Sequence, residues 1–146
     1  QAHLRICRSI EKGEQLPIEL EGQVVYYCGP APSLDRVIGS CGPTTSSRMD
    51  ALTLPLLERG LRGMIGKGRR SSDVVEGIER YGAVYFVAPA GAGAYLSERV
   101  TSCEAVAYED LGPEAIYELK VADMPLIVAC DARGVDIYGD LITGKA

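Results

Sequence analysis

Apolar positions along the chain switch repeatedly between short continuous runs and helical spacing. Short runs rich in β-branched and aromatic residues predict strands, and apolar residues three or four apart predict helices. The predicted strands are 23–28, 37–38, 61–65, 83–88, 104–108 and 126–130, and the predicted helices lie in 3–21, 50–60, 71–82, 91–100 and 113–119. Because strands and helices alternate, the pattern predicts an α/β domain with a mostly parallel central sheet and flanking helices.

Two local signals sharpen this prediction. Ser71, Ser72 and Asp73 can cap a helix that Gly82 would end. The segment 131–134 (DARG) lies between two β-rich runs and is typical of a hairpin turn, with its glycine suited to positive φ. We therefore expect one antiparallel edge on the sheet.

Composition narrows the classes of protein. The chain has 146 residues, 47% of them hydrophobic, which fits a single domain over 1–146 with a real core. Fifteen basic against twenty acidic residues give a net charge of -5, which argues against nucleic acid as a partner. No apolar run approaches the roughly 20 residues that span a bilayer, so we expect no membrane partner and a cytoplasmic location. Gln1 is no natural start, and we expect that an upstream part of the native domain is missing.

The five cysteines, at positions 7, 28, 41, 103 and 130, have wide and irregular spacing. They predict neither a disulfide framework nor a metal site held by this chain alone. Cys28 and Cys130 end apolar runs and are interpreted as small buried residues. Cys41 lies in the most glycine-rich and hydroxyl-rich stretch and could lie near a site without being a ligand.

That stretch, Gly39–Asp50 (GSCGPTTSSRMD), carries the most chemical information. Small residues let the backbone approach a ligand, Thr44 and Thr45 supply hydroxyls, and Arg48 supplies a planar cationic fork. This combination suits a carboxylate, toward which the next helix would direct its amides. From the residues alone, a Ser/Thr-rich helix cap with Arg48 on a solvated face is an equal alternative.

A second candidate is the lysine of Gly63–Gly68 (GMIGKG), which follows an apolar strand. Lys67 would stand at the carboxyl edge of the sheet, where α/β folds gather ligands. The P-loop pattern is not satisfied, because Gly68 stands where Ser or Thr is required. An exposed turn lysine is the alternative for Lys67, and Arg69–Arg70 is interpreted as a solvated basic turn.

His3 is the only histidine, which excludes a histidine-rich metal site. Its place at the start of the chain favours a frayed terminal residue. Glu109–Asp110 could form an acid/base pair, but the acidic start of a helix is the preferred interpretation.

Taken in order, these segments resemble the β-subunit, or C-terminal domain, of class I fumarate hydratases and L-tartrate dehydratases. The resemblance covers nearly the whole chain through VYY with GPAP, IGSCGPTTSSRMD, GLRGMIGKG, YGAVYFVA, AYEDLGPEAIYEL and MPLIVACDARG. It implies a swivelling β/β/α domain beside an α-subunit that holds a [4Fe-4S] cluster, so this chain would contribute no metal ligand. We also expect the assembled complex to form a homodimer.

The resemblance further implies roles for single residues. Thr44 matches a threonine proposed as catalytic base or proton-handling partner, Arg48 and Lys67 match binders of the substrate carboxylates, and Thr45 would help to position them. His3 falls at the histidine of an Arg-Asp-x-Ala-His pattern, which makes it a catalytic candidate. Only Ala2-His3 of that pattern is present.

The function that this implies is the reversible hydration of fumarate to L-malate by a hydro-lyase that is active only with its α-subunit. L-tartrate or another dicarboxylate is the alternative substrate. A stand-alone dicarboxylate-binding module without catalysis is an alternative of a different class, against which the presence of Thr44, Arg48 and Lys67 argues.

Overall fold

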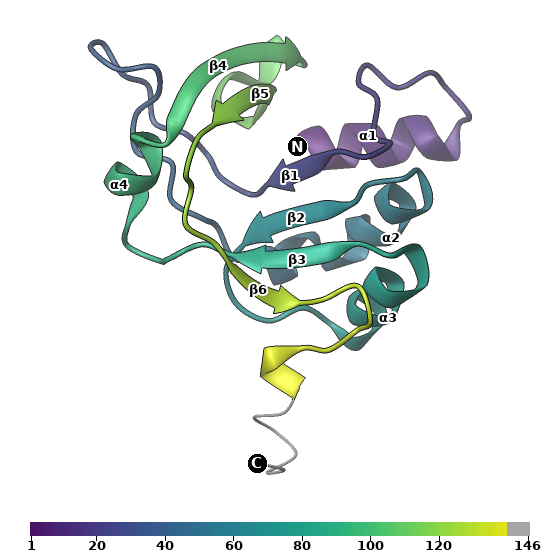
Figure 1. Ribbon diagram of the computed structural model, residues 1–146. Coiled ribbons are helices and arrows are strands. Elements are labelled where there is room, and N and C mark those ends of the chain that lie inside the picture. The colour runs from purple at the N-terminus through teal and green to yellow at the C-terminus, as the bar shows by residue number, and fades with distance from the viewer. Residues whose placement is uncertain (140–146) are drawn as a thin grey trace.

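The computed structural model describes residues 1–139, which form two sheets and a layer of helices (Figure 1). The helices are α1 (Ala2–Glu11), α2 (Asp50–Glu58), α3 (Ser72–Tyr81) and α4 (Gly93–Ser97), with two 3-10 helices, η1 (Ser46–Met49) and η2 (Glu109–Glu114). The strands are β1 (Val24–Tyr26), β2 (Gly63–Gly66), β3 (Val84–Val87), β4 (Val100–Ala107), β5 (Ile116–Val121) and β6 (Ile127–Cys130). Within 1–139, no helix is both long and apolar enough to span a membrane.

The larger sheet has the strand order β1-β2-β3-β6. β1 and β3 both pair with β2 in parallel, and β6 pairs antiparallel with β3. All four residues of the central strand β2 are buried, as expected for a parallel strand covered on both faces. The predicted α/β class, the mostly parallel sheet and its antiparallel edge are confirmed.

The sheet separates two hydrophobic clusters. Helices α1, α2 and α3 lie on one face (Figure 1), and the buried residues between them and the sheet include Leu56, Leu57, Met64, Ile78 and Tyr85. The second cluster includes Ile38, Cys41, Ile65, Leu96 and Val100, so it lies where α4 and the β4–β5 sheet pack. The layers are thus sheet, sheet and helices, as in the β/β/α arrangement that the resemblance implied.

The local signals that predicted α3 are confirmed. The Ser71 side chain accepts a hydrogen bond from the Val74 amide at 3.4 Å, and Gly82 ends the helix in the left-handed conformation at φ +64°. Gly134 likewise has φ +75°, and beyond it Cys130 and Asp136 form an antiparallel bridge. The predicted turn at 131–134 is present.

Three predicted elements are wrong or misplaced. The expected helix 113–119 is instead strand β5, which pairs antiparallel with β4, because the tertiary pairing overrides a weak helical pattern after Pro113. The expected strand 37–38 lies in a loop. The expected helix 91–100 is reduced to α4, and β4 begins at Val100 rather than at residue 104.

Candidate active site

Two segments that sequence analysis singled out separately lie side by side beyond the carboxyl end of β2. Thr45 and Lys67 form a parallel bridge. The Lys67 amide donates to the Thr44 carbonyl at 3.2 Å, and the Ser46 amide donates to the Lys67 carbonyl at 3.0 Å. The backbone therefore holds both threonines next to the lysine, at the sheet edge where ligands of α/β proteins bind.

Glycine is required in the lysine turn for two different reasons. A Cβ on Gly66 would overlap the Ser46 hydroxyl and lie 3.0 Å from a ring carbon of Tyr27. Gly68 has φ +80°, a conformation that residues with side chains rarely adopt. The first glycine allows close approach of the threonine segment, and the second lets the chain turn after Lys67.

Thr44 is anchored to the end of β1. Its amide and its Oγ1 both donate to the Tyr27 carbonyl, at 2.8 and 3.1 Å. The side chain is exposed, so the hydroxyl oxygen keeps lone pairs free to accept a hydrogen bond from a ligand. Within residues 1–139 no carboxylate or imidazole accepts the Thr44 proton.

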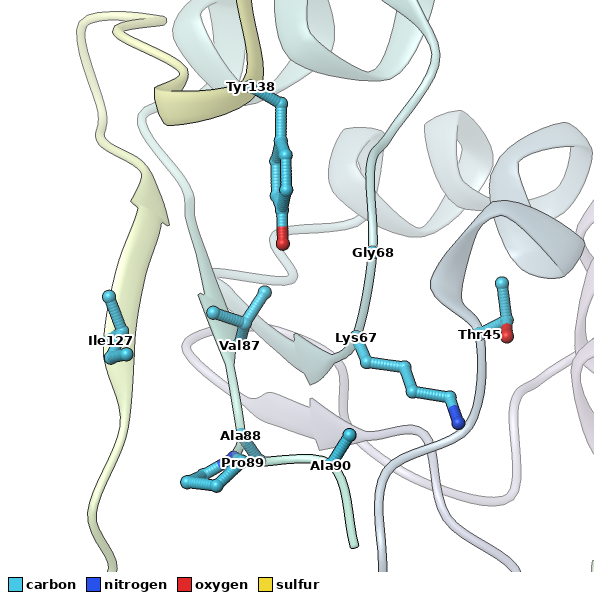
Figure 2. Close-up of a pocket in the computed structure, with 9 residues that line it drawn as sticks. All are labelled: Thr45, Lys67, Gly68, Val87, Ala88, Pro89, Ala90, Ile127 and Tyr138. Atoms are coloured by element: carbon cyan, nitrogen blue, oxygen red, sulfur yellow. The ribbon is translucent and has the colours of Figure 1, made fainter. Parts of the chain in front are cut away.

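Thr45 and Lys67 line a pocket of about 450 Å³. Figure 2 shows the Lys67 side chain extending toward the chain at Thr45, with Tyr138 directing its hydroxyl toward Val87 and Gly68. The remaining wall consists of small and apolar side chains from the ends of β3 and β6, namely Val87, Ala88, Pro89, Ala90 and Ile127. In residues 1–139 the Lys67 ammonium has no acidic partner, so its charge is available to an anion.

Arg48 lies on the turn that follows Thr45. Its amide donates to the Thr45 carbonyl at 3.4 Å within η1, and its side chain is exposed. No ion pair to its guanidinium forms among residues 1–139, but neither Arg48 nor Thr44 lines the pocket of Lys67. The structure thus brings Thr44, Thr45 and Lys67 together and leaves Arg48 on the adjoining surface.

His3 is not a frayed end. It lies in the first turn of α1, with its ring tilted by 56° against the Tyr27 ring at a centroid distance of 5.5 Å. Burial, followed by the charges of the N-terminal amine and of Arg70, lowers the pKa of His3 to about 4. The imidazole is therefore neutral at neutral pH, and its Nε2 is buried without a partner in 1–139. His3 and Thr44 each contact Tyr27, no hydrogen bond joins the two among residues 1–139, and His3 does not line the pocket.

Arg70 contradicts the interpretation of Arg69–Arg70 as a solvated turn. Arg69 is exposed, but Arg70 is only 7% exposed. Its Nε donates to Asp50 Oδ1 at 2.6 Å and its Nη2 to Thr53 Oγ1 at 2.8 Å. The sequence gives no sign of which arginine turns inward, because that depends on the position of Asp50 on the neighbouring helix.

The cysteines do not gather into a metal site. Among residues 1–139, no three His, Cys, Asp or Glu side chains are arranged to hold a metal ion, and all five thiols are free. Cys41 is fully buried, and the Tyr26 hydroxyl donates to its carbonyl at 2.5 Å. Burial raises the pKa of Cys28 to about 12 and that of Cys130 to about 11, so both thiols stay protonated.

The sequence matches the family described as the fumarase C-terminus over residues 1–141. The chain belongs to the fumarase C-terminus family. Relatives of this family include a Methanocaldococcus jannaschii protein provisionally named L(+)-tartrate dehydratase subunit beta, 35% identical over 97% of this chain and 76% of that protein. The aerobic class I fumarate hydratase of Escherichia coli is 34% identical over 94% of this chain. The mitochondrial fumarate hydratase 1 of Leishmania major is 34% identical over 96%.

The fumarase C-terminus relatives differ in how much of their length this chain accounts for. The chain spans 26% of the Escherichia coli and Leishmania major fumarate hydratases, against 76% of the Methanocaldococcus jannaschii protein. The domain thus occurs both as a part of a long polypeptide and as most of a chain named as a subunit.

Proposed function

We propose that this chain is the β-subunit of an iron-sulfur hydro-lyase that reversibly hydrates fumarate to L-malate and is active only with an α-subunit. Membership of the fumarase C-terminus family supports this proposal. The observation that carries it furthest is the pairing of the GPTTSSRMD segment with the GMIGKG turn, which places Lys67 beside Thr44 and Thr45.

The cations would bind the carboxylates of the substrate. Lys67 offers an ammonium without a competing acid in 1–139, beside the Thr45 hydroxyl as a neutral donor. Arg48 would bind the second carboxylate from the adjoining turn, where its exposed fork can form two parallel hydrogen bonds. An ion pair in a partly enclosed site is stronger than in water, so closing the site with a second polypeptide would increase the binding of the dianion.

Thr44 and His3 would handle protons. The Thr44 hydroxyl donates to the Tyr27 carbonyl, and its oxygen remains able to accept a hydrogen bond because the residue is exposed. A threonine hydroxyl acts as a base only when another group accepts its proton, and the neutral His3 imidazole is the candidate for that group within this chain. His3 would act across Tyr27 only if the assembled complex changed the local geometry, so its role depends on the partner.

The residues of this chain do not fit a [4Fe-4S] cluster: Cys28, Cys41 and Cys103 share the second hydrophobic cluster, but no three side chains in 1–139 are arranged to hold a metal ion. We therefore assign the cluster to the α-subunit. When bound, it would supply Lewis-acid activation of the substrate. We further propose that the assembled complex is a homodimer in the cytoplasm.

Dehydration of L-tartrate is the second candidate activity. The name of the Methanocaldococcus jannaschii relative favours it, and that relative matches this chain over the larger share of its own length. Fumarate and tartrate share two carboxylates, so the cationic residues proposed here serve both.

The test is an anaerobic assay of the complex reconstituted with its α-subunit, using fumarate, malate and both tartrate enantiomers. We expect Lys67→Ala and Arg48→Ala each to reduce kcat/KM by about 100-fold or more, since each removes a charge directed at substrate. Lys120→Ala and Arg59→Ala remove exposed charges elsewhere and serve as matched controls. Near-normal kinetics for both site variants would reject the proposed site.

Thr44→Ala distinguishes proton handling from binding. We expect a loss mainly in kcat, with partial recovery in Thr44→Ser, which keeps the hydroxyl. An effect confined to KM would assign Thr44 to substrate binding.

A further inference from the structure

One buried hydroxyl touches both segments of the candidate site. The Tyr85 side chain rises from β3 and is 1% exposed, and its oxygen lies 2.8 Å from the Gly68 carbonyl and 2.9 Å from Ser46 Oγ. Because a carbonyl can only accept, the tyrosine proton is donated to Gly68, which leaves the Ser46 hydroxyl to donate to the tyrosine oxygen. Ser46 follows Thr45 and Gly68 follows Lys67 in the sequence, so one side chain connects the residues that come next after both pocket residues.

A buried ion pair makes a second connection between the same two segments. Asp50, at the end of the threonine segment, accepts from Arg70 Nε at 2.6 Å and from the Ser71 amide at 2.7 Å. The Arg70 guanidinium also lies 5.4 Å from the Tyr27 ring centre and 5.0 Å from that of Tyr85. It therefore packs against the residue whose carbonyl anchors Thr44 and against the residue that joins Ser46 to Gly68.

These connections leave the site little freedom to move. Gly66 already brings the Ser46 side chain against the strand so closely that a methyl group would not fit. Buried polar groups with all partners in place strongly favour one arrangement, because any displacement leaves a polar atom unpaired away from water. Gly68 lines the pocket, whereas the side chains of Tyr85, Ser46, Arg70 and Asp50 do not.

We propose that Tyr85 and Arg70 are positioning residues that hold Thr45 and Lys67 in register so that both reach one carboxylate of the substrate. The inference rests on the function proposed above. Since Thr45 and Lys67 would bind the carboxylate in the substrate as well as in the transition state, weakening these two contacts raises KM more than it lowers kcat. The loss of one net hydrogen bond corresponds to an increase in KM of up to about tenfold.

The test compares Tyr85→Phe with Ile78→Val in two measurements. Tyr85→Phe removes only the connecting hydroxyl, whereas Ile78→Val removes one buried methylene from α3, an element that belongs to neither segment and makes no hydrogen bond through that side chain. In the full chain, amide hydrogen exchange is followed at Ser46 and Lys67, whose amides join the two segments, with the Val84 amide as reference because it bonds Arg62 at the other end of the sheet. We expect about tenfold faster exchange at Ser46 and Lys67 in Tyr85→Phe alone.

In the reconstituted complex we expect Tyr85→Phe to raise the KM for the dicarboxylate about tenfold with kcat within threefold of wild type, and Ile78→Val to change neither. Unchanged exchange at Ser46 and Lys67, or equal acceleration at Val84, would overturn the inference. Faster exchange with an unchanged KM would overturn it too. If the wild-type complex has no hydro-lyase activity, the proposed function fails, while the exchange experiment still decides whether Tyr85 holds the two segments together.

Discussion

Replacing Arg70 with methionine tests the buried ion pair, and the adjacent Arg69 supplies a matched control. The Arg70 side chain is 1% exposed and that of its partner Asp50 13%. Removing one member of a buried pair costs about 3–5 kcal/mol, because the other charge is left without its partner. The Ser71 amide still compensates Asp50 in part, so we place the loss near the lower end, at about 3 kcal/mol. For a chain of this size that corresponds to a decrease in Tm of about 6–12 °C.

Arg69→Met removes the same charge from an exposed side chain whose one hydrogen bond within residues 1–139 is to the Tyr138 carbonyl. We expect a change of about 0.5 kcal/mol or less. Urea unfolding followed by circular dichroism measures both variants, with the slope m compared to verify that the unfolded states are alike. Asp50→Asn combined with Arg70→Met should lose less than the sum of the single losses, since no isolated charge remains. Arg70→Met within 1 kcal/mol of Arg69→Met would refute the reasoning.

Three further predictions concern pH, packing and the surface. The pKa of His3 in the folded protein, about 4, is below its value in the unfolded chain, so the stability that the neutral imidazole contributes is lost as the pH falls from about 6.5 to 4, by at most about 3 kcal/mol. The free energy of unfolding of His3→Gln should therefore depend less steeply on pH in that range, and equal slopes for variant and wild type would contradict the prediction. Gly66→Ala should lower the free energy of unfolding by about 1–3 kcal/mol, because the added methyl group overpacks against Ser46, and the double variant with Ser46→Ala should recover part of this loss. If the losses of the two single variants simply add in thermal unfolding, that contact is not the cause. Asp110→Asn breaks an exposed pair with Arg5 and should lower Tm only slightly and only at low salt, so a large loss at high salt would show another role.

The elements that the sequence predicts well are those set by local chemistry. Helix α3 has a serine that caps its first turn and a glycine whose left-handed conformation ends it, and both act within a few residues of the chain. Strand β5 depends on β4, with Ala105 opposite Tyr117, and no local pattern contains that pairing. The same distinction explains why α4 is shorter than its run of small residues suggested.

The candidate site divides in the same way. Thr44, Thr45 and Lys67 can be selected from residue type and glycine spacing, but that they meet follows from β1 and β2 being parallel neighbours. Tyr138 reaches the pocket from a distant segment and carries no recognisable motif. Tyr85 does leave a signal, since a tyrosine within the apolar run of β3 requires a hydrogen-bond partner for its hydroxyl when it is buried.

The electrostatics of the site follow from which cations the fold neutralises. Arg70 is buried, so it needs Asp50, and the pair has almost no net charge to offer a ligand. Lys67 and Arg48 have no acidic partner within residues 1–139 and keep their charges, although the whole chain has a net charge of -5. At the candidate site, a dianion would therefore meet two side chains whose charges no acid of residues 1–139 neutralises. Because Asp50 neutralises Arg70, the positioning role proposed for Arg70 would not compete for a carboxylate ligand.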